Sequence, residues 1–195
     1  MEGKSVITMP EKLQEIMDEL KIANAETFYH SIHVKNHVYR MIRKMNQDGF
    51  TAYSCEEINS ICKGALLHDV GKLYVRNFIL TKNSRLTKEE KDSMAKHPSL
   101  GFEAVKTYLT EGEYEIIKNI CLYHHERCDG KGYAGISELP VYVQAVSICD
   151  VYDALTTDRI YRTSMSPDMA TKLIERGECG MFNSEIIAYL EKTME

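Results

Sequence analysis

Apolar residues recur along this chain at the three- and four-residue spacing of amphipathic helices, and no convincing alternating strand pattern is found. Capping signals such as Ser54-Cys55-Glu56-Glu57 and Thr87-Lys88-Glu89-Glu90 mark where helices begin. The expected helices begin after Pro10 and then cover about 26–45, 54–69, 87 onward, 98–109, 113–125, 141–157, 167–175 and 184–192. Residues 71–86 should be a connection with short helical turns, and residues 126–139 a glycine-containing loop.

This succession of helices predicts an all-α fold, a single helical bundle without an internal repeat or a linker that would split it. We expect residues 25–195 to form the domain and residues 1–24 to form a short N-terminal helical extension. Leu13, Ile16, Met17 and Leu20 give this extension an apolar stripe. The stripe should pack on the core, and a homodimer through it is the alternative.

Composition and charge exclude several classes of protein. The chain has 195 residues, a net charge of −5 and 27% charged residues, which is typical of a globular domain and argues against a binder of polymeric nucleic acid. It has no apolar stretch long enough to span a membrane and no secretory leader pattern, so we expect a cytoplasmic protein. The six cysteines form no CxxC pair, so reduced thiols, most of them in the core, are expected.

The candidate chemistry is a set of histidines and carboxylates at helix ends or on apolar helix faces. Glu26 and His30 are four residues apart on one helix, so they share a face. The set comprises Glu26, His30, His68, Asp69, His97, His124, His125 and Asp150. Because buried carboxylates and imidazoles need a partner, so many together indicate bound metal.

The mixture of imidazole and carboxylate without thiolate suits iron, manganese, zinc or cobalt, and eight donors exceed what one ion can use. Two or three divalent ions with bridging carboxylates would account for the set. Such a site activates a bridging water and holds the oxygens of a phosphoryl group. Lys72, four residues after His68, would supply a cation for a substrate phosphate or a leaving oxygen.

Each residue also has a purely structural interpretation. Glu26 could be a carboxylate at a helix start, and His97 could cap a helix. His68 and Asp69 could form a buried hydrogen-bonded pair. His33 and His37, on the same helix as His30, are expected to be structural or to support the ligands from behind.

Three ordered motifs then carry a family resemblance: Leu67-His68-Asp69-Val70-Gly71-Lys72, His124-His125-Glu126-Arg127-Cys128-Asp129-Gly130-Lys131-Gly132-Tyr133, and Ala145-Val146-Ser147-Ile148-Cys149-Asp150-Val151-Tyr152-Asp153-Ala154-Leu155-Thr156. The series resembles the HD-GYP family, a branch of the HD-domain metal phosphohydrolases, over about residues 26–190. The resemblance implies an all-helical bundle that hydrolyses the bacterial second messenger cyclic di-GMP with two or three divalent ions, iron or manganese first, and zinc, cobalt or nickel as alternatives.

The resemblance assigns all eight donors named above as metal ligands, and Glu26 as the acid that permits a third ion. It implies catalytic roles for Lys72 and Asp69. Substrate contacts are implied for Lys72, Tyr133, Asp153, Arg159 and Arg162.

The chain departs from the family's pattern at two points, both in the loop that follows the paired histidines. The family's Gly-Tyr-Pro reads Gly132-Tyr133-Ala134 here, and the loop to Pro140 looks shorter than usual. A changed loop could reshape the groove or alter contacts with a signalling-protein partner through residues 126–139.

Three functions therefore stay open. The first is a phosphodiesterase for a cyclic dinucleotide, most simply cyclic di-GMP. The second is a phosphohydrolase for another nucleotide or phosphoester, as in the broader HD superfamily. The third is a signalling module that binds metal and a cyclic dinucleotide with weak or no turnover.

Overall fold

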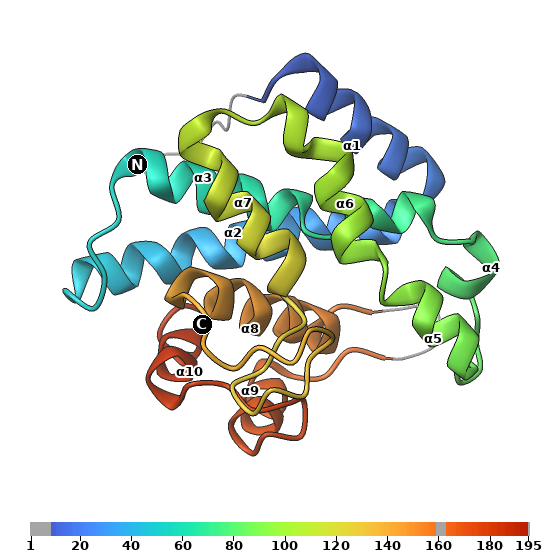
Figure 1. Ribbon diagram of the computed structural model, residues 1–195. Coiled ribbons are helices and arrows are strands. Elements are labelled where there is room, and N and C mark those ends of the chain that lie inside the picture. Colours follow the sequence, from blue (N-terminus) through green and yellow to red (C-terminus); the bar gives the residue numbers. More distant parts are fainter. Residues whose placement is uncertain (1–8, 159–162, 195) are drawn as a thin grey trace.

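The computed structural model describes residues 9–158 and 163–194, and helices are the regular elements of this part of the chain (Figure 1). In chain order they are α1 (Glu11–Ala23), α2 (Ala25–Gln47), α3 (Cys55–Leu67), η1 (Val70–Tyr74), α4 (Asn77–Leu80), α5 (Lys88–Met94), α6 (His97–Val105), η2 (Lys106–Tyr108), α7 (Glu111–Tyr123), α8 (Val141–Thr156), α9 (Pro167–Glu175) and α10 (Ser184–Glu191). The all-α prediction is confirmed. α2 packs against α3 and α8, and α1 lies against α2 and η1.

Side-chain hydrogen bonds cap several helices at the start positions that the sequence predicts. Ser54 accepts a hydrogen bond from the Glu57 amide and Glu57 accepts one from the Ser54 amide, a complete capping box. Thr87 and Glu90 repeat the arrangement before α5. At α2 the cap is Asn24, whose side chain accepts from the Thr27 amide at 2.9 Å.

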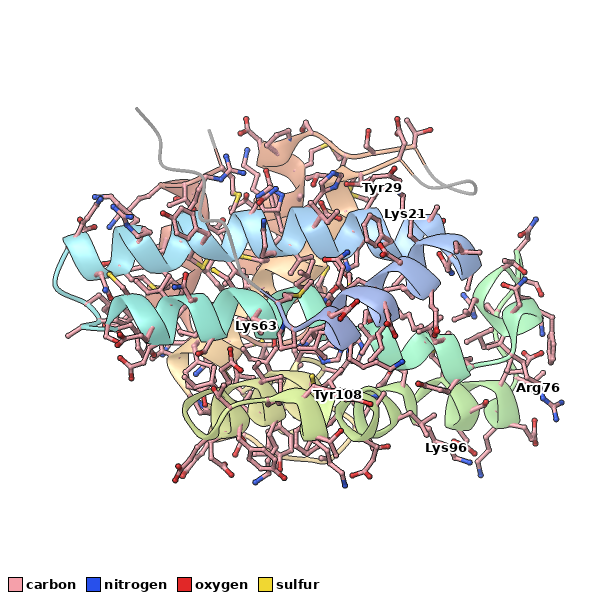
Figure 2. The ribbon with its side chains drawn as sticks, turned by 90° about the horizontal axis from the view of Figure 1, so that it is seen from above. Lys21, Tyr29, Lys63, Arg76, Lys96 and Tyr108 are labelled. Atoms are coloured by element: carbon pink, nitrogen blue, oxygen red, sulfur yellow. The ribbon has the colours of Figure 1, made fainter. Side chains whose placement is uncertain are left out.

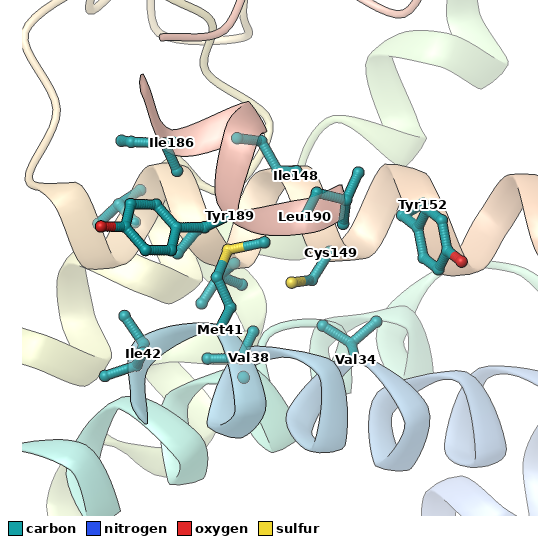
Figure 3. Close-up of a cluster of buried hydrophobic side chains, with 14 of the residues drawn as sticks. Val34, Val38, Met41, Ile42, Ile148, Cys149, Tyr152, Ile186, Tyr189 and Leu190 are labelled. Carbon is teal, nitrogen blue, oxygen red and sulfur yellow. The ribbon is translucent and has the colours of Figure 1, made fainter. Parts of the chain in front are cut away.

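The main hydrophobic core lies between α2, α3, α8 and α10 (Figure 3). Val38 and Met41 of α2, Ile148 of α8 and Leu190 of α10 are fully buried there. Burying such side chains contributes about 1.5–3 kcal/mol each. This core holds the long helices α2 and α8 side by side, so polar residues on their facing surfaces are brought together.

A second core joins α1 to η1, α6 and α7. Leu13, Met17 and Leu20 of α1 are 0–1% exposed, so the apolar stripe of this helix packs on the core of its own chain. The division into an extension and a domain at residue 24 remains a prediction, since α1 shares this core with later helices.

Glycines allow η1 and α6 to touch backbone to backbone. A Cβ added at Gly71 would lie 1.9 Å from the carbonyl oxygen of His97 and 2.5 Å from the amide of Gly101. A Cβ added at Gly101 would in turn lie 2.9 Å from the amide nitrogen of Gly71. The contact sets the distance between Asp69, just before η1, and His97, the first residue of α6.

The structure differs from the sequence predictions in a few places. α7 begins at Glu111 instead of Glu113, because the Thr110 amide donates to Glu113 one turn later, and it ends at Tyr123, before the paired histidines. Only three of the six cysteines, Cys62, Cys121 and Cys149, are buried.

Among the described residues, none of the helices combines the length and the apolar content that crossing a membrane would require.

Candidate metal centre

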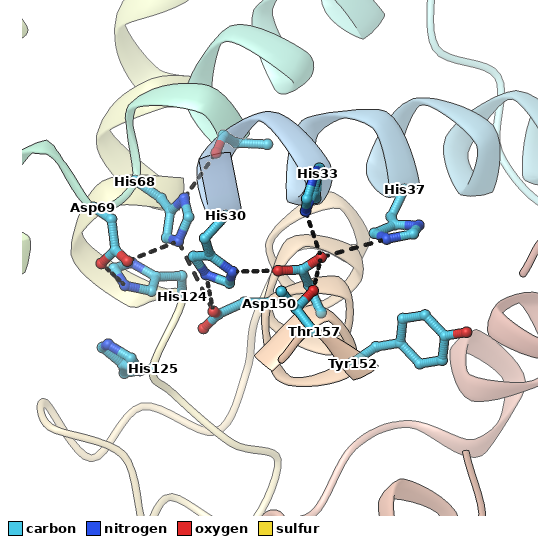
Figure 4. Close-up of polar contacts among 12 residues, drawn as sticks. His30, His33, His37, His68, Asp69, His124, His125, Asp150, Tyr152 and Thr157 are labelled. Carbon is cyan, nitrogen blue, oxygen red and sulfur yellow. Dashed lines mark hydrogen bonds and ion pairs between the residues drawn. The ribbon is translucent and has the colours of Figure 1, made fainter. Parts of the chain in front are cut away.

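Seven of the eight predicted donors converge at one place in the fold; all of them except His97 are labelled in Figure 4. His30 and Asp150 project from the facing sides of α2 and α8. The other five lie at helix ends: His68 and Asp69 after α3, His97 at the start of α6, and His124 and His125 after α7. All are buried except His125, which is half-buried.

Backbone carbonyls fix the tautomer of three of these histidines. Nδ1 of His68 donates to the Ala65 oxygen at 2.7 Å, and Nδ1 of His97 to the Met94 oxygen at 2.8 Å. Nδ1 of His124 is shared between the Ile120 and Cys121 oxygens. Because Nδ1 carries the proton in each ring, the Nε2 lone pair is left to face the centre, which is how metal-binding histidines are held.

The first group of donors consists of Asp69, His97, His124 and His125, whose ligand atoms all lie within 4.8 Å of one another. Nε2 of His97 is 3.3 Å from Nε2 of His124 and 3.2 Å from Nε2 of His125. Lone pairs that face each other at this distance repel unless a proton or a cation lies between them. The spacing is what neighbouring ligands of one metal ion have.

The second group consists of His30, His68 and Asp69, again with ligand atoms within 4.8 Å. Asp150 joins it, with Oδ1 2.9 Å from Nε2 of His30 and 3.9 Å from Nε2 of His68. Nε2 of His68 is fully buried and has no hydrogen-bond partner. A buried nitrogen acceptor without a donor is explained by an ion at this position.

Asp69 belongs to both groups. Its Oδ1 is 3.2 Å from Nε2 of His97, and its Oδ2 is 3.4 Å from Nε2 of His68. Oδ1 also lacks a hydrogen-bond partner although it is buried. One carboxylate oxygen therefore faces each group, which is the geometry of a bridging ligand.

Burial and neighbouring charges keep His124, His125 and Asp69 in the protonation states that metal binding needs. Burial, followed by the other imidazoles, lowers the pKa of His124 well below its usual value, and burial lowers the pKa of His125 to about 3. Burial opposes ionisation of Asp69, but Lys72 and His68 outweigh it and hold its pKa well below the usual range. Neutral imidazoles and ionised carboxylates are the ligand forms of these side chains.

The remaining predicted residues have different positions. Glu26 is one helical turn before His30, exposed, and outside both groups. Nζ of Lys72 donates to Oδ2 of Asp69 at 2.5 Å, so the lysine reaches the centre. Tyr133 is half exposed, with its ring 4.7 Å from the ring of His125. Arg159 and Arg162 lie outside the described residues.

Asp153 is buried, and its carboxylate lies against His30 of α2. Its Oδ2 accepts from Nδ1 of His30 at 2.6 Å, and its Oδ1 lies 3.3 Å from His33 and 3.7 Å from His37. Burial opposes the charge on His30, yet Asp150 and Asp153 raise its pKa to about 9. In the sequence, the only feature that anticipates these contacts of Asp153 is the spacing of His30, His33 and His37 along one helix. The contacts agree with the expectation that His33 and His37 support the ligands from behind.

Sequence reasoning missed Glu126. This residue is fully buried, and its two carboxylate oxygens accept from the amides of Ala134 at 2.7 Å and Ile136 at 2.9 Å. A Cβ at Gly132 would lie 2.5 Å from Glu126, so the loop passes directly over it. Glu126 thus holds the loop 126–139, with Tyr133, beside the paired histidines. The only sequence feature that could have pointed to Glu126 is that an acidic residue directly follows His124-His125.

Comparison with known proteins gives a consistent picture. The HD domain family matches residues 27–155. A cyclic di-GMP phosphodiesterase of Vibrio cholerae is 35% identical over 137 residues, 67% of this chain and 28% of that protein. A 3'3'-cGAMP-specific phosphodiesterase 3 of the same organism is 31% identical over 135 residues, 68% of this chain and 29% of that protein. The chain thus spans less than a third of either relative.

Among solved structures, the fold is similar to that of Bd1817, an HDG"Y"P protein from Bdellovibrio bacteriovorus, with a TM-score of 0.65. The likeness covers 93% of this chain and 60% of that one at 19% identity, so it concerns the fold alone.

Proposed function

The chain belongs to the HD domain family, and on that premise we propose that it is a metal-dependent phosphodiesterase that hydrolyses a cyclic dinucleotide. The observation that carries the proposal is the buried convergence of imidazole Nε2 atoms and carboxylates with Asp69 between two donor groups. A pair of ions at such a site is suited to phosphoryl transfer.

The proposed ligands form two sets that share Asp69. His97, His124 and His125 would hold one divalent ion, and His30, His68 and Asp150 the other. Iron or manganese is proposed first, since imidazole and carboxylate without thiolate suit them. Glu26 would be needed only for a third ion. When bound, the ions supply a nucleophilic hydroxide and charge neutralisation at the phosphate.

The chain's own residues then position the substrate. Lys72 would place its ammonium against a phosphate oxygen or the leaving oxygen, because its Nζ already reaches the edge of the centre. Tyr133 would offer its ring as a wall beside His125. Arg159 and Arg162 are proposed to bind the second phosphate or a guanine, which suits the forked guanidinium group.

Cyclic di-GMP is the first candidate substrate, because relatives named for it share about a third of their matched residues with this chain. A relative named for 3'3'-cGAMP makes a hybrid dinucleotide the next candidate. Both are intracellular signals, so a cytoplasmic location belongs to the proposal. A signalling partner at the loop 126–139 and a homodimer stay predictions.

The test is metal content together with turnover on the same anaerobically purified sample. We expect about two iron or manganese ions per chain and conversion of cyclic di-GMP to the linear dinucleotide, lost after chelation and regained with the metal. Cyclic di-AMP, 3'3'-cGAMP and a panel of other nucleotides are assayed in parallel. A metal-free protein, or a metallated one that leaves every phosphoester intact, would contradict the proposal.

Asp153 provides a separate prediction about the metal centre. The Asp153→Asn variant should bind metal about ten- to a hundred-fold more weakly, because the carboxylate that orients His30 through Nδ1 is lost. Ions retained after dialysis against graded chelator measure this without any substrate. The control is Asp168→Asn, an exposed carboxylate on α9, which should match the wild type. Equal retention by both variants would show that Asp153 does not orient the ligand.

A further inference from the structure

A cavity of about 230 Å³ opens beside the metal centre, between the end of α1, η1 and the start of α4. Leu20, Leu73, Val75 and Leu80 form its apolar walls. Figure 2 looks down on this side of the molecule, with α1 above the helices it covers and Lys21 and Tyr29 labelled near its junction with α2. Neither donor group uses this cavity.

Lys72 connects the cavity to the centre. The residue lines the cavity, and its Nζ donates to Oδ2 of Asp69. A phosphate held between Lys72 and the ions would therefore lie against a residue of the cavity wall. Whatever is attached to that phosphate can reach inside.

The size and lining of the cavity fit one nucleobase. Ligand pockets for drug-sized molecules measure roughly 300–1,000 Å³, so a space of about 230 Å³ is too small for a dinucleotide but suits one flat ring system. Apolar walls with few polar groups are typical of such sites.

The polar side chains at the cavity all offer N–H donors; they are Asn24, Lys72 and Asn77. Oδ1 of Asn24 is already used by the Thr27 amide, so its Nδ2 is the group left to offer a ligand. Lys72 adds a donor, and Asn77 adds a second amide. Guanine presents two adjacent acceptors, O6 and N7, on one edge; lysine is among the side chains that recognise this edge, and the amide N–H groups add donors.

We propose that this cavity is a guanine subsite for the nucleotide whose phosphate lies at Lys72 and the metal centre. The inference rests on the proposed function, because it names where one base of that substrate binds. It assigns substrate recognition to α1 and α4, outside the motifs that carry the chemistry.

The experiment compares two ligands that differ only by the base. Calorimetry measures the Kd of guanosine 5'-monophosphate and of ribose 5-phosphate for the metal-loaded full chain and for Ala23→Trp. Ala23 lines the cavity at the end of α1 and is solvent-exposed, so an indole there fills the space without disturbing the core. We expect GMP to bind at least about tenfold more weakly to the variant and ribose 5-phosphate to bind equally to both.

The control is Ile22→Trp, which adds the same side chain one residue earlier, at a position that is 87% exposed and does not line the cavity. It should bind GMP like the wild type. The subsite is refuted if Ala23→Trp keeps the wild-type Kd for GMP, or if both ligands weaken together. If GMP shows the expected difference while no cyclic dinucleotide is hydrolysed, the subsite stands and the proposed function fails.

Discussion

Replacement of Asp69 by asparagine should lower phosphodiester turnover by about three powers of ten or more. The carboxylate presents one oxygen to the His97 group and the other to the His68 group. An amide keeps the shape but loses the charge and one acceptor, so the two donor sets are no longer bridged. Metal-assisted charge stabilisation contributes several kcal/mol to such reactions, and each 1.36 kcal/mol is a factor of ten in rate.

The measurement pairs metal ions per chain with kcat for cyclic di-GMP on the same samples. Asp92→Asn, an exposed carboxylate on α5, is the control and should keep both values. Loss of turnover in Asp69→Asn with full metal occupancy would assign the residue to the reaction instead of to the assembly of the site. Wild-type turnover in this variant would contradict the bridging role.

Gly71→Ala should destabilise the protein by about 3 kcal/mol, because the added methyl group overlaps backbone atoms that have no room to move. Its Cβ would stand 1.9 Å from the carbonyl oxygen of His97. For a chain of this length the change corresponds to a fall in Tm of roughly 6–12 °C. Since η1 and α6 must separate, His97 should also move away from Asp69, and metal affinity should fall.

Thermal unfolding of the metal-free proteins measures the first effect, and chelator competition measures the second. Gly112→Ala is the matched control, because a Cβ there meets nothing within 4 Å and the residue lies in the first turn of α7. Alanine should be neutral or stabilise that helix by about 0.5–1 kcal/mol. A Tm for Gly71→Ala equal to that of the control would show that the backbones can separate at little cost.

Local sequence signals predicted the helices well, because most of the predicted caps and helix bounds occur in the structure. The capping boxes at Ser54 and Thr87 form, and the predicted bounds of the helix at 167–175 match α9. The end of α7 was placed two residues late. There, periodicity would continue through His124 and His125, but the chain leaves the helix so that both imidazoles reach the centre.

The ligand set could be anticipated from residue types, but the geometry behind it could not. Nothing in a pairwise spacing shows that Asp69 faces both groups, because α3, α6 and α7 bring the donors together only in three dimensions. Asp153 was expected at a substrate, yet it contacts His30 from 123 positions away. Long-range contacts of this kind leave no periodic trace in a sequence.

The buried Glu126 has a consequence for which residues position 134 can accept. Its carboxylate gathers the loop through the amides of Ala134 and Ile136, and a proline at position 134 would have no N–H to give. The change from Gly-Tyr-Pro to Gly-Tyr-Ala is therefore compatible with a shorter loop that closes on the glutamate. An N–H group at position 134 is therefore a requirement of this loop, because a proline there would remove one of the two hydrogen bonds that hold Tyr133 beside His125.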